Sequence, residues 1–345
     1  MKILFITQLS ETNNFEDKFI NDIISDMTLH GLKEVHGDNL IDYPGAWYMY
    51  KDEVIKKNYD IKKLWGNGFT YYNLLDNYNS IDRSDIKNKI KKNNFEFIIY
   101  GAFEKSKLYF EEALNSKSKI IIIDGRDTNQ FNKIVENNKI IYFKRELTTN
   151  NFRNVFPINV SVPSKKITNH VNKNPNNLLA PLIPYRYKTY VYKDENEYYQ
   201  MWRDSLFGIS YKPPWGHWWE SVKYYEMMMN GCIPLFVGLK NCPEQTLTLF
   251  PKKNLLNIFS KYSWILSQYF PLKIYRKELL TYKNFALYFK NIFKKKMNIK
   301  SFLDQNPDIN SIRSNLINYT KEYLTTNYTA KYIINTSQDF YNYKK

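Results

Sequence analysis

The segment from Trp215 to Pro234 constrains the fold most, because an aromatic loop, a helix, a stop signal and the start of a strand follow one another within it. Residues 220–229 contain no glycine or proline, and Ser221 is suited to cap the start of a helix there. The pair Asn230-Gly231 favours the end of that helix, since both residues tolerate the left-handed backbone conformation. The apolar run at 232–238 then predicts a buried strand.

The start of this predicted helix has the chemistry of an anion site. Lys223 and Glu226 are three positions apart, so they share one helical face. Backbone amides at a helix N-terminus attract anions, and a nearby lysine adds to that attraction. Glu226, one turn further on, can accept hydrogen bonds from a ribose diol, so the segment suits a nucleoside diphosphate. The alternative is an ordinary surface ion pair worth about 0.2–0.5 kcal/mol, and spacing alone leaves both interpretations open.

A longer pattern of residues surrounds this helix and resembles a known family. It runs from Tyr198 to Lys253 and is similar to the donor-binding half of exostosin-like glycosyltransferases and their bacterial and viral relatives. The family more often has Arg-His where this chain has Lys223-Tyr224, and a lysine binds phosphate as a point charge, without the bidentate fork of arginine. The residues that carry the resemblance are, in order, Trp219, Glu220, Ser221, Lys223, Tyr224, Tyr225, Glu226, the run Gly231 to Phe236, Cys242-Pro243 and Phe250-Pro251-Lys252.

The resemblance implies an α/β protein of the GT-B type, with two doubly wound, Rossmann-like units facing across a cleft. It also implies a C-terminal helix that crosses back to the first unit. Lys223 would stabilise the leaving diphosphate as its charge develops, in place of a metal ion, so no metal and no other cofactor is expected. The residues expected to bind the donor are Trp219, Ser221, Lys223, Tyr225, Glu226 and Arg126.

Strands and helices alternate twice along the chain, which independently favours two doubly wound domains. We expect an acceptor-side domain at 1–160, a linker at 161–177, a donor domain at 178–320 and a helical tail at 321–345. Apolar runs predict strands at 2–7, 95–100, 119–123, 140–143, 188–192, 205–211 and 254–258, and apolar periodicity predicts helices that include 15–29, 196–203 and 312–324.

The strongest predicted strand, at 119–123, leads directly into Asp124-Gly125-Arg126-Asp127. Ligands of open parallel sheets bind beyond the carboxyl ends of the strands. Asp124 and Asp127 are therefore candidates for the base that accepts a proton from a sugar hydroxyl, and Arg126 for a phosphate contact. The alternative is a turn with a local ion pair.

An unusual aromatic stretch at 42–70 carries Trp47, Trp65 and several tyrosines between glycines and a proline. It has no regular periodicity, so we interpret it as an irregular loop region. Two interpretations stay open: the stretch lines an acceptor site, or it is an insertion packed by its own aromatic side chains.

Composition limits the remaining functions. The net charge of +16 suits anionic partners, such as nucleotide sugars, lipid headgroups or nucleic acid, and equally a solvated lysine surface. Two cysteines make neither a disulfide framework nor a zinc site, and no apolar run is long enough for a membrane span. We expect a cytoplasmic protein, with contact to a membrane surface left open, acting on a nucleotide-sugar donor and a glycan, lipid-linked or protein acceptor. The alternatives are an inactive relative that binds sugar nucleotides, and a nucleic-acid-binding protein that stacks bases on its aromatic residues.

Overall fold

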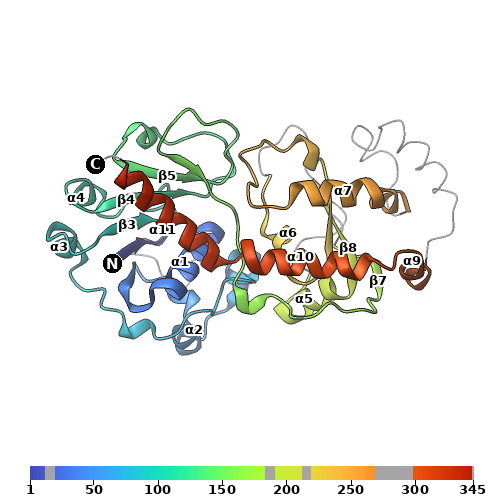
Figure 1. Cartoon of the computed structure of the whole chain (residues 1–345). Coiled ribbons are helices and arrows are strands. Elements are labelled where there is room, and N and C mark those ends of the chain that lie inside the picture. The colour runs from blue at the N-terminus through green and yellow to red at the C-terminus, as the bar shows by residue number, and fades with distance from the viewer. Residues whose placement is uncertain (12–19, 183–190, 212–218, 269–297, 344–345) are drawn as a thin grey trace.

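The computed structural model describes residues 1–11, 20–182, 191–211, 219–268 and 298–343. Two parallel sheets lie side by side in it (Figure 1). We call the part built on the first sheet the N-terminal unit and the part built on the second sheet the C-terminal unit. The prediction of a mixed α/β protein with parallel sheets is confirmed.

The sheet of the N-terminal unit has six strands in the order β2-β1-β3-β4-β5-β6, and each strand is parallel to its neighbours. The order changes direction between β1 and β3, which is the kind of position where ligands of open α/β sheets bind. Four of the strands are short apolar runs at the predicted positions: β1 (Ile3–Ile6), β3 (Phe97–Tyr100), β4 (Lys119–Asp124) and β5 (Ile140–Lys144). The other two, β2 (Leu40–Tyr43) and β6 (Val155–Pro157), were not predicted.

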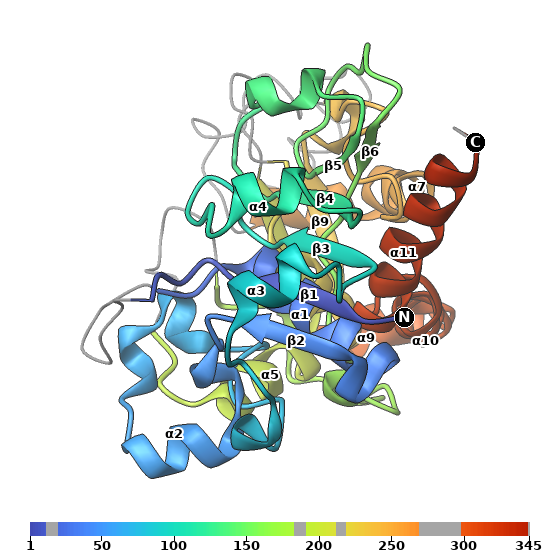
Figure 2. The same cartoon turned by 90° about the vertical axis from the view of Figure 1, so that its left-hand side faces the viewer.

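Both faces of this sheet are covered, because successive side chains of a strand point to opposite faces. On one face, Ile98 and Ile122 pack in a cluster with residues of α3 (Ile86–Lys91) and α4 (Phe110–Leu114). On the other, Ile99 and Ile123 join a larger cluster that includes α1 (Ile23–His36) and α11 (Thr326–Asn342). Figure 2 shows α11 on one side of the sheet and α3 and α4 on the other.

Helix α1 differs from the helix predicted at 15–29. Residues 12–19 lie outside the described residues, and the helix starts at Ile23, where the Asp22 side chain accepts hydrogen bonds from the amides of Ile24 and Ser25. It continues to His36 and ends at Gly37, which has a φ of 54°. The prediction therefore ended the helix too early. The capping chemistry of Asp22 and Gly37 sets its limits.

The C-terminal unit has a three-stranded parallel sheet in the order β7-β8-β9. The strand predicted at 254–258 is wrong, since these residues belong to α7, in which Leu255 and Tyr262 are buried one and three turns along the same helix. The strand predicted at 188–192 lies mostly outside the described residues. The elements are β7 (Asn177–Leu179), β8 (Ser205–Tyr211), β9 (Ile233–Val237), α5 (Glu195–Arg203), α6 (Val222–Met229), α7 (Lys252–Tyr262), α9 (Ile299–Gln305) and α10 (Ile309–Tyr323), with α2 (Lys51–Lys57) in the N-terminal unit.

The last two helices join the units. Helix α10 lies against α6, and α11 then crosses to pack on α1 (Figure 1). At the crossing point, Val162 donates a hydrogen bond to Leu324 O at 2.9 Å and accepts one from the amide of Thr326 at 3.0 Å. A close approach fixes the packing, because a Cβ at Gly31 of α1 would lie 2.0 Å from Thr326 O. None of the helices in the described ranges combines the length and the apolar character needed to cross a membrane.

Candidate functional site

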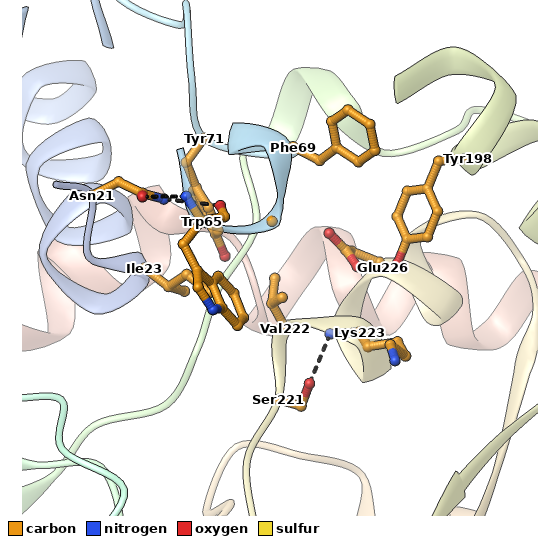
Figure 3. A pocket seen from close by; sticks show the side chains of 11 residues that line it. Asn21, Ile23, Trp65, Phe69, Tyr71, Tyr198, Ser221, Val222, Lys223 and Glu226 are labelled. Atoms are coloured by element: carbon orange, nitrogen blue, oxygen red, sulfur yellow. Dashed lines mark hydrogen bonds between the residues drawn. The ribbon is translucent and has the colours of Figure 1, made fainter. Parts of the chain in front are cut away.

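A cavity of about 240 Å³ lies between the two units, at the start of α6 (Figure 3). The N-terminal unit contributes residues that precede or begin α1 and residues of the aromatic stretch. The C-terminal unit contributes the first turn and a half of α6 and one residue of α5. The lining residues are Asn21, Ile23, Trp65, Gly66, Phe69, Tyr71, Tyr198, Ser221, Val222, Lys223 and Glu226.

Helix α6 begins as the sequence predicts. Ser221 is its N-cap, and its hydroxyl accepts a hydrogen bond from the amide of Lys223 at 3.4 Å. Because the first amides of a helix have no partner within the helix, this end carries a partial positive charge toward the cavity. Residues 212–218, which include most of the aromatic loop before α6, lie outside the described residues.

Lys223 places a second positive charge in the cavity. Within the described part of the chain, no carboxylate lies in ion-pair distance of its ammonium group. Burial lowers the pKa of Lys223, and attraction to Glu226 opposes that shift. The interpretation of Lys223 and Glu226 as a surface ion pair is therefore wrong, because Glu226 is buried and no direct contact pairs the two side chains.

Glu226 is held by hydroxyl groups from both units. Its Oε1 atom accepts a hydrogen bond from Thr70, and its Oε2 atom accepts one from Tyr198 at 2.6 Å. Burial raises the pKa of Glu226, and the two hydroxyl donors and Lys223 oppose that shift. A buried carboxylate that needs such donors is well suited to bind further hydroxyl groups of a ligand.

The aromatic stretch at 42–70 is divided between the hydrophobic core and the cavity, and its expected role at an acceptor site stays a prediction. Trp47 and Tyr48 are buried in the hydrophobic core, as expected for an insertion packed by its own side chains. Trp65 and Phe69 instead line the cavity. The backbone of Trp65 is fixed by Asn21, whose Oδ1 accepts the Trp65 amide at 2.7 Å and whose Nδ2 donates to Trp65 O at 3.2 Å.

Three of the residues predicted to bind the donor do not line the cavity. Trp219 is buried, and its amide donates to Oε2 of Glu146 at 3.1 Å. Tyr225 is also buried and donates its hydroxyl to Glu220. Both residues thus help to hold the start of α6 through contacts outside the cavity. The third residue, Arg126, lies in the polar cluster at the end of β4.

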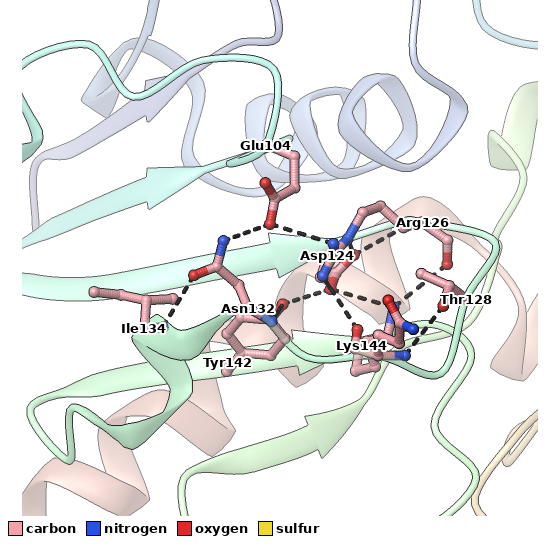
Figure 4. A network of polar contacts seen from close by, with 9 residues as sticks. Glu104, Asp124, Arg126, Thr128, Asn132, Ile134, Tyr142 and Lys144 are labelled. Atoms are coloured by element: carbon pink, nitrogen blue, oxygen red, sulfur yellow. Dashed lines mark hydrogen bonds and ion pairs between the residues drawn. The ribbon is translucent and has the colours of Figure 1, made fainter.

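Asp124 lies at the centre of that cluster (Figure 4). Arg126 donates to both of its oxygens, at 3.0 and 2.8 Å, and the ammonium group of the buried Lys144 lies 3.2 Å away. Tyr142 donates its hydroxyl to the same carboxylate. Burial would raise the pKa of Asp124, but Arg126, Lys144 and Tyr142 outweigh it and lower the pKa below its usual value. The arrangement matches the alternative interpretation, a turn with a local ion pair. Arg126, Tyr142 and Lys144 all contact the Asp124 carboxylate.

Asp127 has a different environment. Its carboxylate is exposed and pairs with Arg145, whose other terminal nitrogen donates to Glu220 O at 3.3 Å. Asp127 is therefore connected through Arg145 to the loop that leads into α6. Neither Asp127 nor Asp124 lines the cavity described above.

Sequence reasoning missed several polar residues around the cavity. Thr70, Tyr198 and Glu146 reach it or its supporting loop from segments far away in the chain. Asp26 of α1 is a further buried carboxylate, which accepts hydrogen bonds from Gln8 at 3.1 Å and from Tyr48. Burial raises the pKa of Asp26 to about 7. Thr70 and Tyr198 stand next to an aromatic residue in the sequence, and Glu146 follows a strand. These positions are the local signals that could have indicated the three residues.

No family model matches the chain, and a search of curated proteins finds no match. Among the described residues, no group of three or more His, Cys, Asp or Glu side chains is placed to hold a metal ion.

Proposed function

We propose that the protein is a glycosyltransferase that moves a sugar from a nucleotide-sugar donor to a glycan, lipid or protein acceptor. The observation that carries the proposal is the placement of Ser221, Lys223 and Glu226 on one cavity at the start of α6, between two parallel α/β units. Lys223 and Glu226 form no ion pair with each other, and both line the cavity, so both are available to a ligand.

The cavity offers complementary groups to the parts of such a donor. The start of α6 and the ammonium group of Lys223 bind the diphosphate, since both present positive charge. Glu226 accepts hydrogen bonds from a diol of the ribose. The aromatic rings of Trp65, Phe69 and Tyr71 offer flat apolar surfaces to a base or sugar ring.

The reaction follows from these positions. An acceptor hydroxyl oxygen forms a bond to the anomeric carbon, and the bond from that carbon to the diphosphate breaks. The diphosphate leaves with the bonding electrons, and Lys223 stabilises the developing charge. The acceptor proton passes to a base. Asp127 suits this role better than Asp124, because its carboxylate is exposed and has fewer donors bound to it.

The arrangement of the units supports the finer fold assignment. Two parallel sheets stand side by side, and α11 returns from the C-terminal unit to pack on α1. These features are what a GT-B arrangement requires, and we assign the chain to that arrangement as part of the proposal. The N-terminal unit then binds the acceptor, and the C-terminal unit binds the donor.

Thermal stabilisation by a panel of nucleoside diphosphates and their sugars tests the proposal. A ligand at 100 times its Kd adds about 2.7 kcal/mol to the free energy of unfolding, which a melting curve detects. We expect a shift with the nucleotides of one base, lost in Glu226→Ala and retained in Glu197→Ala, an exposed glutamate of α5. A folded protein that no nucleotide or nucleotide sugar stabilises would contradict the proposal. A shift without sugar transfer would instead indicate the inactive relative.

A further inference from the structure

Thr70 has an unusual backbone conformation. Its φ is 77°, a region that a β-branched residue rarely adopts, and its side chain is completely buried. Such a conformation is unfavourable and persists only where the surrounding contacts enforce it. Gly66, Asn67 and Gly68, just before it, also have positive φ values of 68°, 55° and 68°. Glycine and asparagine tolerate such values, so the unfavourable backbone conformation in the segment 64–71 is that of Thr70.

The polar contacts that hold Thr70 itself come from the C-terminal unit. The Thr70 amide donates to Glu195 Oε1 at 2.6 Å, and the Thr70 hydroxyl lies 2.7 Å from the hydroxyl of Tyr199. The same hydroxyl donates to Glu226 Oε1. Nearby, Asn67 donates its side-chain amide to Tyr192 O at 3.1 Å. Thr70 thus makes three polar contacts with α5 and α6, and one of them is with the carboxylate that lines the cavity.

The neighbours of Thr70 form the opposite wall of that cavity. Trp65, Gly66, Phe69 and Tyr71 line it, while Thr70 is completely buried beside it, where its hydroxyl contacts Glu226. Figure 3 shows Tyr71 beside Trp65, and Phe69 beside Tyr198. Thr70 therefore connects the position of the wall with the position of the carboxylate, beside a second link in which Phe69 stacks on Tyr198, with ring centroids 5.6 Å apart, and Tyr198 donates to Glu226.

We propose that Thr70 is a positioning residue, whose hydroxyl fixes the Glu226 carboxylate and thereby sets the 64–71 wall for ligand binding. The inference rests on the proposed function for the identity of the ligand, a nucleotide sugar. A ligand that binds Glu226 also affects the position of the wall, because Glu226 is hydrogen-bonded to Thr70 and the wall belongs to the same segment as Thr70. The strained backbone conformation of Thr70 places its hydroxyl at Glu226 and its aromatic neighbours at the cavity.

Hydrogen exchange of the backbone amides at 64–71 tests the inference without any ligand. Thr70→Val keeps the shape of the side chain and removes the hydroxyl, while Thr70→Ser keeps the hydroxyl. We expect exchange to be about tenfold faster in Thr70→Val, since a lost buried hydrogen bond weakens local stability by that factor. Thr70→Ser should exchange within about twofold of the wild type. Glu226→Ala removes the partner from the other side and should accelerate the same amides, so it decides the question if the valine variant does not fold.

Unchanged exchange in both Thr70→Val and Glu226→Ala would overturn the inference. Equal acceleration in Thr70→Val and Thr70→Ser would overturn it too, because the lost packing and not the hydroxyl would then be responsible.

Ligand binding gives the second readout. With the nucleotide sugar that stabilises the wild type, we expect Thr70→Val to raise the Kd about tenfold and Thr70→Ser to leave it within about twofold. An unchanged Kd in Thr70→Val would contradict the role in ligand binding. If no nucleotide sugar binds the wild type, the proposed function fails, and the exchange comparison still decides whether Thr70 positions Glu226 and the wall.

Discussion

Glu146 and Trp219 join the two units by a hydrogen bond of 3.1 Å, in which the backbone amide of Trp219 donates to Oε2 of the Glu146 carboxylate. The other carboxylate oxygen accepts the amide of Glu220, also at 3.1 Å. Glu146 is completely buried just after β5, and the two amides belong to the loop that leads into α6. The N-terminal unit therefore helps to fix the start of the helix on which the candidate donor site lies.

Replacing this carboxylate should destabilise the protein. In Glu146→Ala, two buried amides lose their acceptor, and an unsatisfied buried group costs about 1–3 kcal/mol. We expect the free energy of unfolding to fall by about 2–4 kcal/mol in urea denaturation. Glu111→Ala, at an exposed position in α4, is the control and should change it by less than about 0.5 kcal/mol. Equal stabilities of the two variants would show that Glu146 does not hold the loop.

Glu220 should make stability depend on pH. Burial raises its pKa from 4.5 to about 7, against the hydroxyl of Tyr225, the charge of Arg145 and the amide of Val160, while the nearby carboxylate of Glu146 adds to the rise. Between these two pH values the folded protein keeps a proton that the unfolded chain releases. The free energy of unfolding therefore falls as pH rises through this window, by up to about 3 kcal/mol.

Glu220→Gln removes this titration and keeps the carbonyl oxygen as an acceptor. Urea denaturation between about pH 5 and pH 8 should show a smaller loss of stability in this variant than in the wild type. Some loss should remain, because Asp26 also has a pKa raised to about 7. Glu197→Gln, at an exposed site, should follow the wild type. Parallel curves for Glu220→Gln and wild type would contradict the raised pKa of Glu220.

Asp124 should matter first for stability. Asp124→Asn leaves Lys144 buried without a charged partner, and breaking a buried pair in this way costs about 3–5 kcal/mol. Asp127→Asn breaks a pair whose carboxylate is exposed although Arg145 is mostly buried, and its cost should be smaller than that of Asp124→Asn. Urea denaturation of the two variants measures the difference. If Asp124→Asn kept the stability of the wild type and lost sugar transfer, Asp124 would be the catalytic base after all.

Gly31 should determine how α11 attaches to the N-terminal unit. An added Cβ would lie 2.0 Å from Thr326 O, so Gly31→Ala must push α1 and α11 apart. We expect a loss of about 1–3 kcal/mol in unfolding free energy, together with faster proteolysis within α11. Lys331→Ala, at an exposed position of α11, should leave both nearly unchanged. An unchanged melting curve and unchanged proteolysis in Gly31→Ala would contradict the tight packing at this crossing.

Strands β1, β3, β4 and β5 were predictable because each is an apolar run in a sheet covered on both faces, whereas β2 includes Asp42 and β6 has only three residues. β4 shows this most clearly, since every residue from Ile120 to Asp124 is buried. Helix α6 was predictable at both ends, because Ser221 and Asn230-Gly231 are local signals that do not depend on tertiary contacts. Helix α7 was mistaken for a strand because its helical spacing appears only over the full range from Leu255 to Tyr262.

Only the part of the candidate site that lies at the start of α6 was predictable. Ser221, Lys223 and Glu226 share the first turns of one helix, so their spacing placed them together. Trp219 and Tyr225 are close in sequence but do not line the cavity, and spacing alone does not show which residues near a helix start face a partner unit. The contact between Thr70 and Glu226 joins residues 156 positions apart and depends on how the two units meet. A single sequence contains no local signal for such a contact.

Release of nucleoside diphosphate from a panel of nucleotide sugars, with a mixture of oligosaccharides as acceptors, tests the central claim most directly. The account predicts release from donors of one base by the wild type, and a loss of about 100-fold or more in Lys223→Met, because the lysine stabilises the leaving diphosphate. Lys240→Met, at an exposed position after β9, should retain the wild-type rate. Equal rates in Lys223→Met and wild type, or no release from any donor by a folded protein that binds none of them, would contradict the account.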